Sequence, residues 1–209
     1  MKQTNDLGHR VSELIEVSIA TKQSLLQCQK AVSTIAKVSK LLIDALRQGN
    51  KVLLFGNGGS ATDAQHIAAE LVGRFAFDRP ALPALALSVN SSCVTAIGND
   101  YGFDRVFSRQ LEALGRPGDV AIGISTSGDS LNVQNAMSAA KKIGLHTVAL
   151  TGLTGGSLRN MVDHCICVPS NETPRIQECH ILIGHIISQL VEREIFHEEG
   201  RVSGSRRSY

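Results

Sequence analysis

Two stretches of the sequence hold side chains that could move protons or bind a metal ion. His66 and Glu70 are four residues apart in "SATDAQHIAAEL", so on a helix they would share one face. Near the C-terminus, Gln177, His180 and His185 lie among isoleucines and leucines in "RIQECHILIGHIISQL". Histidine and glutamate can donate and accept protons near neutral pH. The same His, Glu and Gln side chains could instead bind a divalent metal ion, and the two uses are compatible.

The spacing of the C-terminal residues limits how they can act together. His180 and His185 are five residues apart, which places them about 140° apart around an ideal helix. We therefore expect only one of them to be functional and the other to lie in the core or an interface. Gln177 and His185 are separated by about 12 Å along the helix axis. A metal ion bound by both would need extended side chains or a ligand from a neighbouring subunit.

Four apolar runs end in small polar residues, at 56–60 ("GNGGS"), 125–130 ("STSGDS"), 151–157 ("TGLTGGS") and 169–173 ("PSNET"). Hydroxyls and backbone N–H groups from several loops can hold a phosphate without a lysine, particularly if Ser60 and Ser130 cap helices. Any one such loop could equally be an ordinary turn. The first loop matches neither the Walker pattern nor G-x-G-x-x-G, which argues against a nucleotide. Proton transfer on a phosphorylated small molecule fits the whole set.

These residues need a scaffold that brings the ends of strands together. Five apolar runs alternate with amphipathic stretches of about a dozen residues, at 51–56, 84–89, 120–125, 147–152 and 165–170. Runs that are hydrophobic throughout predict strands covered on both faces, and the intervening helices predict parallel pairing. The pattern indicates an α/β fold with a doubly wound five-stranded parallel sheet, whose carboxyl edge binds ligands. Apolar spacing near the helical period predicts N-terminal helices over about residues 5–48.

Length and composition predict one domain over residues 1–199, followed by a flexible basic tail at 200–209. A formal charge of +2 gives no electrostatic reason to expect nucleic acid as a partner. No run reaches the roughly 20 apolar residues of a membrane span, and the first ten residues lack the apolar core of a signal peptide. The five cysteines are odd in number and lie mostly in apolar runs, as is typical of a reducing compartment. We expect a cytoplasmic protein that binds neither nucleic acid nor membranes.

Four segments resemble, in the same order, the sugar isomerase (SIS) domain family: "GNGGSATDAQHIAAEL", "AIGNDYGFDRVFSRQ", "GDVAIGISTSGDS" and "TPRIQECHILIGHI". The similarity extends from about residue 5 to residue 197. It implies a flavodoxin-like five-stranded parallel sheet and a homotetramer with active sites between subunits. Within the family it is nearest to the members that convert sedoheptulose 7-phosphate to D-glycero-D-manno-heptose 7-phosphate by proton transfer between C1 and C2. That product supplies heptose for the lipopolysaccharide core or related surface glycans.

The resemblance also implies roles for individual residues. The catalytic pair falls on Glu70 and His185. Some members carry one zinc ion per subunit, and its ligands would be His66, Glu70, Gln177 and His185. Pro174 stands where some isomerases have an acidic residue, so a contact made by that position is in doubt. The substrate-binding residues implied are Asn57, Gly58, Gly59, Ser60, Arg74, Asn99, Asp100, Ser125, Thr126, Ser127, Ser130 and Gln177.

A non-catalytic SIS protein is the main alternative. A regulator similar to the factor that binds the bacterial replication initiator would keep the phosphate loops but lack the acid–base pair. Because Glu70 and His185 are both present, the sequence favours the enzyme. A phosphosugar-sensing regulator would normally carry a DNA-binding domain, for which this chain has no room.

Overall fold

The computed structural model describes residues 2–196, with side chains from residue 7 onward. The predicted basic tail at 200–209 and the predicted domain end at 199 lie outside these residues. Five strands pair in parallel in the order β2-β1-β3-β4-β5, as the sequence predicted. They are β1 (Val52–Gly56), β2 (Ala84–Ala86), β3 (Val120–Ile124), β4 (His146–Thr151) and β5 (His164–Cys167).

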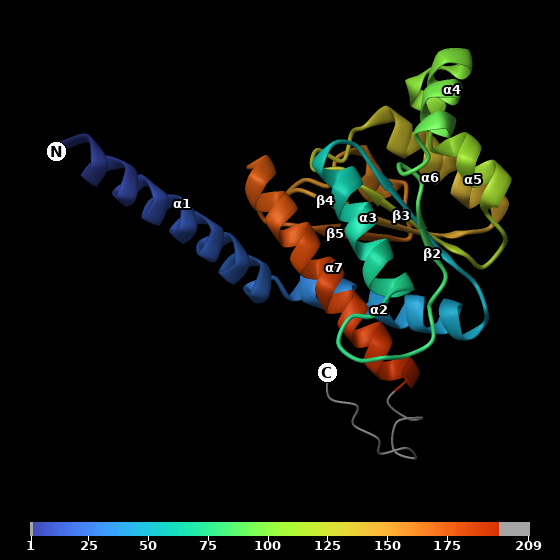
Figure 1. Cartoon of the computed structure of the whole chain (residues 1–209), viewed down its shortest axis with the longest axis horizontal. Coiled ribbons are helices and arrows are strands. Elements are labelled where there is room, and N and C mark those ends of the chain that lie inside the picture. Colours follow the sequence, from blue (N-terminus) through green and yellow to red (C-terminus); the bar gives the residue numbers. More distant parts are fainter. Residues whose placement is uncertain (1, 197–209) are drawn as a thin grey trace.

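Helices precede, connect and follow the strands in the described part of the chain (Figure 1). They are α1 (Lys2–Gln27), α2 (Gln29–Arg47), α3 (Gly59–Val72), α4 (Ser91–Tyr101), α5 (Ser108–Leu114), α6 (Leu131–Ile143) and α7 (Thr173–Phe196). Two short 3₁₀ turns, η1 (Phe103–Arg105) and η2 (Ser157–Asn160), lie between them. The first two helices confirm the predicted helical N-terminal segment.

Alternate residues of each strand pack on opposite faces of the sheet. Val52 and Leu54 of β1 belong to the core shared with α2, α3 and α7, while Leu53 and Phe55 belong to the core shared with α5 and α6. All five residues of β1 are buried, and the same is true of β3. This arrangement explains why the strands are hydrophobic throughout, since neither face meets water.

The strand order reverses between β1 and β3. The chain runs from β1 outward to β2 and then returns to place β3 on the other side of β1. Loops leaving two such strands diverge, and the crevice between them is where doubly wound sheets bind ligands. Asn57, after β1, and Asn132, at the start of α6, exchange two amide hydrogen bonds of 2.9 Å across this point. The pair fixes the first loop against the second.

The helix starts at this edge differ in part from the expectation. The prediction that Ser60 caps α3 was wrong, because the N-cap is Gly58, whose φ is +54°. A turn that needs a positive φ favours glycine, which has no Cβ to clash. Ser130 does occupy the N-cap of α6, but its hydroxyl makes no capping bond. Instead its Oγ lies 3.0 Å from Oγ of Ser125.

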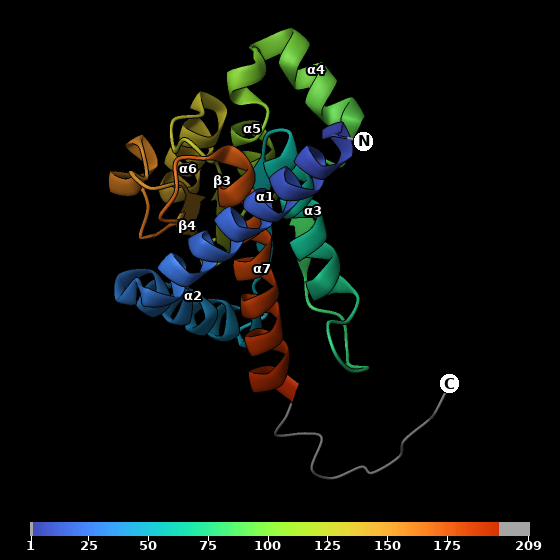
Figure 2. The ribbon, with the colours of Figure 1, turned by 90° about the vertical axis from the view of Figure 1, so that its left-hand side faces the viewer.

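Helix α1 extends away from the sheet, and it packs mainly against α2 and α7 (Figures 1 and 2). Ser18 donates a 2.6 Å hydrogen bond to Glu178 of α7, and Arg175 donates one of 2.9 Å to the carbonyl of Leu14. Apolar side chains along much of α1 remain exposed: Leu7, Val11, Leu14, Ile15, Val17, Ile19 and Leu26. One copy of the chain therefore leaves an apolar helix surface uncovered.

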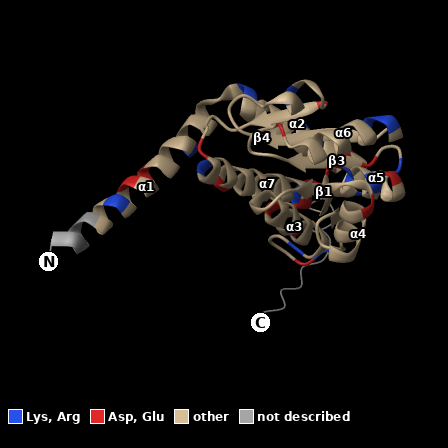
Figure 3. Cartoon of the chain, turned by 90° about the horizontal axis from the view of Figure 1, so that it is seen from above, with Lys and Arg blue, Asp and Glu red and all other residues tan. Residues whose placement is uncertain are grey.

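None of the described helices combines the length and the apolar character that crossing a membrane would require. Basic and acidic residues are interspersed over the helices instead of being segregated by sign (Figure 3).

Candidate active site

Hydroxyl groups gather in the loop between β3 and α6. The Oγ atom of Ser125 lies 3.0 Å from Oγ of Ser130 and 3.4 Å from Oγ of Ser127, and it accepts a 3.2 Å hydrogen bond from the Gly128 N–H. Ser127 in turn accepts a hydrogen bond from the backbone N–H of Asp129. Ser125 is buried, whereas Ser127 is exposed. We call Ser125, Thr126, Ser127 and Ser130 the hydroxyl cradle; it offers hydroxyls beside the N-terminus of α6, a combination suited to an anion.

The loop after β4 closes one side of the hydroxyl cradle. The carboxylate of Asp129 accepts hydrogen bonds of 2.8 and 2.7 Å from the backbone and hydroxyl of Ser157. These two bonds, the backbone one foremost, lower the pKa of Asp129 below its ordinary value. The carbonyl of Thr126 accepts a 2.9 Å bond from the N–H of Gly152. Two of the predicted loops are thereby joined at the carboxyl edge of the sheet.

A second group of polar residues lies between α3 and α7. Nε2 of His66 is 3.1 Å from Oε1 of Glu70 and 3.1 Å from Nε2 of His185. The ligand atoms of the three residues all lie within 4.8 Å of one another. The ring of Phe75 packs against the His185 ring, with centroids 5.7 Å apart. We call His66, Glu70 and His185 the His–Glu triad; two imidazoles and a carboxylate in this arrangement form a donor set suited to zinc.

Gln177 lies apart from the His–Glu triad in one copy of the chain. A Cβ atom on Gly59 would overlap the amide group of Gln177, so the two residues are in close contact. Gly184, further along α7, similarly packs against Ile67 of α3. The two helices thus run side by side in the same direction, with Gln177 near the start of α3 and His185 about two turns further on. The predicted zinc ligands His66, Glu70 and His185 converge, while Gln177 lies near the hydroxyl cradle end of α3.

Of the two α7 histidines, His180 is the one that lies in the core. Its ring is buried, and Nε2 lies 3.1 Å from the carbonyl oxygen of Thr151. Burial lowers the pKa of His180 to about 4, so the ring is neutral at physiological pH and donates to that carbonyl.

Burial shifts the pKa of Asp63, one turn before His66, in the opposite direction. Burial raises its pKa to about 6, although the nearby His66 opposes the shift.

A buried ion pair, which the sequence reasoning missed, supports the His–Glu triad. Glu192 of α7 is fully buried and accepts hydrogen bonds from the backbone N–H groups of Phe75 and Ala76 and from Nε of Arg79. The Arg79 guanidinium also donates to the carbonyls of Glu70, at 2.8 Å, and Leu71, at 2.7 Å. It thereby fixes the end of α3 that carries Glu70. The signal in the sequence was a glutamate on the apolar face of α7, seven residues after His185.

Three further residues expected to bind substrate belong to neither group and are exposed in a single copy of the chain. Arg74 is exposed after the C-terminal end of α3. Asn99 and Asp100 are exposed on α4 and bonded to each other, with 2.8 Å between the Asn99 amide nitrogen and the Asp100 carboxylate.

Comparison with known proteins agrees with this fold. The model of the SIS domain family matches residues 19–152. The phosphoheptose isomerase of Sulfurimonas denitrificans is 56% identical over 186 residues, which cover 89% of this chain and 95% of that protein. That of Aneurinibacillus thermoaerophilus is 55% identical, with coverage of 87% and 92%. The solved structure of phosphoheptose isomerase from Neisseria gonorrhoeae has a TM-score of 0.84 and 44% identity, and covers 89% of this chain and 98% of its own. The chain therefore belongs to the SIS domain family, in the branch of the phosphoheptose isomerases.

Proposed function

We propose that this enzyme converts sedoheptulose 7-phosphate to D-glycero-D-manno-heptose 7-phosphate. The observation that carries the proposal is the convergence of His66, Glu70 and His185 within 4.8 Å on two helices that begin at the carboxyl edge of the sheet. The names of the close relatives support a heptose phosphate as the substrate. Its product would enter the synthesis of surface-glycan heptose.

The hydroxyl cradle is the proposed phosphate site. Ser125, Ser127 and Ser130 supply hydroxyl donors, and the first turn of α6 adds backbone N–H groups and the positive end of the helix dipole. Asn57, Gly58, Gly59 and Ser60 line the neighbouring turn, where the small glycines let the backbone approach a ligand. The phosphate would anchor the substrate so that its other end is available to an acid–base pair.

Isomerisation between a 2-ketose and an aldose moves a proton between C1 and C2, most simply through an enediol. Glu70 is the proposed base for the carbon proton, and His185 the partner that serves the oxygens. Arg79 holds the backbone of Glu70, and Phe75 packs on the ring of His185. The residues that contact Glu70 and His185, Arg79 and Phe75, both donate hydrogen bonds to the buried Glu192 carboxylate, which holds them in place.

The His–Glu triad fits a divalent metal ion, and we propose zinc, one per subunit. His66, Glu70 and His185 would hold it. Gln177 of a neighbouring subunit would complete the ligand set, because the Gln177 of the same subunit lies near Gly59 and apart from the His–Glu triad. A bound zinc ion supplies Lewis-acid polarisation of a carbonyl. The exposed side chains of Arg74, Asn99 and Asp100 would reach substrate only when copies of the chain assemble.

We further propose a cytoplasmic homotetramer that needs neither nucleic acid nor a membrane. The exposed apolar side chains of α1 support assembly, because a helix of this kind is usually covered by a second copy. Light scattering at micromolar concentration should give four times the mass of the chain. A monomeric mass would remove the basis for sites shared between subunits.

Turnover of sedoheptulose 7-phosphate by metal-stripped and zinc-loaded protein tests the proposed function. Glu70→Gln should abolish both turnover and the exchange of solvent deuterium into the substrate carbon, while helix content and assembly stay unchanged. Glu112→Gln, on the exposed face of α5, is the matched control and should retain activity. Exchange at the wild-type rate in Glu70→Gln would show that Glu70 is not the base.

A further inference from the structure

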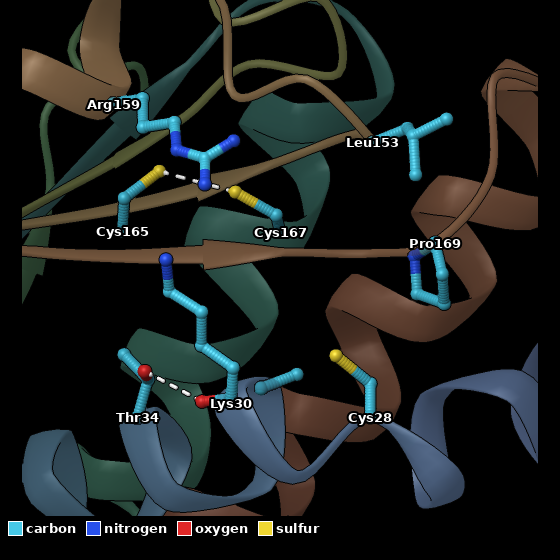
Figure 4. A pocket seen from close by; sticks show the side chains of 9 residues that line it. Cys28, Lys30, Thr34, Leu153, Arg159, Cys165, Cys167 and Pro169 are labelled. Atoms are coloured by element: carbon cyan, nitrogen blue, oxygen red, sulfur yellow. Dashed lines mark hydrogen bonds between the residues drawn. The ribbon is translucent and has the colours of Figure 1, made fainter.

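A cavity at the edge of the sheet holds a group of thiols that the proposed reaction does not use. Strand β5 lies at the edge of the sheet, so among the described residues no strand pairs with its outer side. Cys165 and Cys167 are two residues apart on β5 and share one face, with 3.7 Å between their sulfur atoms. Both cysteines line a cavity of about 150 Å³, and Cys28 lines it too. Figure 4 shows the three side chains around this cavity. All three cysteines are partly exposed.

Two cations and a hydroxyl surround these sulfurs. Arg159 of η2 and Lys30 of α2 line the cavity, and Figure 4 shows both extending toward β5 from opposite sides. Thr151 Oγ1 donates to Sγ of Cys167 at 3.5 Å and lies 3.4 Å from Sγ of Cys165. No carboxylate is among the described residues that line the cavity. The environment therefore favours a negative charge on sulfur and in the adjoining space.

Cys167 is the sulfur that this environment ionises. The hydrogen bond from the Cys165 thiol lowers the pKa of Cys167 to about 6, with further contributions from Thr151, Arg159 and Lys30, while burial opposes the shift. The same hydrogen bond, together with burial, raises the pKa of Cys165 above its ordinary value. The two shifts therefore favour a Cys167 thiolate that accepts a hydrogen bond from the Cys165 thiol.

We propose that Cys167 is a nucleophilic site that forms a mixed disulfide with a small anionic disulfide, which Lys30 and Arg159 attract into the cavity. The Cys167 thiolate attacks one sulfur of that disulfide. A new S–S bond forms as the original one breaks, and the other half leaves as a thiolate. The incoming disulfide is the oxidant, so the step needs no other reactant. A carboxylate on the retained half would lie near the two cations.

The expected gain in rate is moderate at pH 7 and larger in weak acid. A thiol with a pKa of about 6 is half ionised at pH 6, whereas an ordinary cysteine is almost fully protonated there. A thiolate of lower pKa is also intrinsically less nucleophilic, which cancels part of this advantage. The net result should be a reaction roughly ten-fold faster than that of an ordinary cysteine at pH 6. The pH dependence therefore distinguishes this site from the remaining thiols.

Two disulfide probes at pH 6 test the proposal independently of the isomerase activity. The dianionic aromatic disulfide DTNB and the uncharged dithiodipyridine both release a coloured thiol. DTNB should give a fast phase of one equivalent per chain, with the adduct retained on Cys167 in peptide mapping. Cys167→Ser should lose this phase, and Cys28→Ser, its control, should keep it. Circular dichroism checks that both variants are folded.

A charge-neutral variant tests the role of the cations. In the double variant Lys30→Met, Arg159→Met, the rate ratio of DTNB to dithiodipyridine should fall several-fold, because the anionic probe loses its attraction. A fast phase that survives in Cys167→Ser, or a ratio that stays unchanged in the double variant, would overturn the proposal. Release of two equivalents without a retained adduct would also overturn it, since Cys165 would then have displaced the adduct.

Discussion

Nε2 of His66 and Nε2 of His185 face each other at 3.1 Å across the contact between α3 and α7. Two N–H groups cannot point at each other at this distance, so at least one of the two nitrogens must present a lone pair. Oε1 of Glu70 lies 3.1 Å from the same nitrogen of His66. At least one imidazole lone pair and a carboxylate oxygen are thus directed into one small volume.

Removing one side chain of the His–Glu triad should weaken metal binding strongly. We expect His66→Ala to lower the affinity for zinc by more than about 100-fold, because loss of a direct ligand should exceed the effect of losing a supporting residue. Competition against a chromophoric chelator measures this affinity. His146→Ala, on the exposed first residue of β4, is the control. Equal zinc affinity in His66→Ala and wild type would place the metal elsewhere.

Loss of one hydroxyl from the hydroxyl cradle should weaken substrate binding. A hydrogen bond to a charged group contributes about 1.5–3 kcal/mol, so Ser125→Ala should lower the affinity for a phosphosugar by roughly 10- to 150-fold. Calorimetry with the phosphosugar measures this affinity in the variant. Ser12→Ala, an exposed position on α1, should bind as wild type does. If Ser125→Ala bound the phosphosugar normally, the phosphate would not lie in the cradle.

The buried ion pair behind the His–Glu triad should matter greatly for stability. Glu192→Ala would leave Arg79 buried without its counter-charge and two backbone N–H groups without acceptors. Breaking a buried pair in this way costs about 3–5 kcal/mol of unfolding free energy. Urea denaturation measures the loss. Glu112→Ala breaks only the exposed pair with Arg105 and should cost less than about 1 kcal/mol; similar losses in both variants would contradict the structural role of Glu192.

Asp63 should make the folded state less stable as the pH rises. Its pKa is about 6 in the folded protein and about 3.8 ordinarily, so folding favours the protonated form. The stabilisation is present below pH 3.8 and is lost as the pH rises through 6. Asp63→Asn keeps the group neutral. At pH values above 6 it should therefore raise the urea concentration at the midpoint of unfolding, whereas near pH 4 it should change that concentration little.

The comparison with Asp44→Asn isolates the effect of Asp63. Asp44 is partly exposed on α2 and paired with Lys40, so its replacement should leave the difference between the midpoints at pH 4 and pH 7.5 close to that of wild type. If the urea midpoint of Asp63→Asn depended on pH as the wild-type midpoint does, Asp63 would be ionised in the folded protein at no cost in the free energy of folding.

Local patterns predicted the sheet and part of the site. Strands such as β1 and β3 are hydrophobic throughout because both faces are covered, and this property is visible in five consecutive residues. The contact between His66 and Glu70 follows from helical spacing alone. In the same way, the angle between His180 and His185 correctly separates a residue facing Thr151 from one facing His66.

The remaining features depend on residues far apart in the chain. Asn57 and Asn132 are 75 positions apart, and Glu192 binds Phe75 across 117 positions. No local period relates such residues, since their contact depends on strand order and on which helix covers which face. The Gly58 cap was missed for a different reason: a positive φ is a property of the turn, and serine is the commoner capping residue.

The position of α7 in the chain has a consequence for biosynthesis. It is the last described helix, yet it packs against α1, α2 and α3 near the start, and Glu192 fixes the segment after α3. A ribosome delivers α2, β1 and α3 long before it delivers α7. Until then Leu42 and Ile67, both buried in the finished protein, lack the helix that helps to cover them. The nascent chain therefore carries an open apolar surface until α7 has left the exit tunnel, and only then can it close this core.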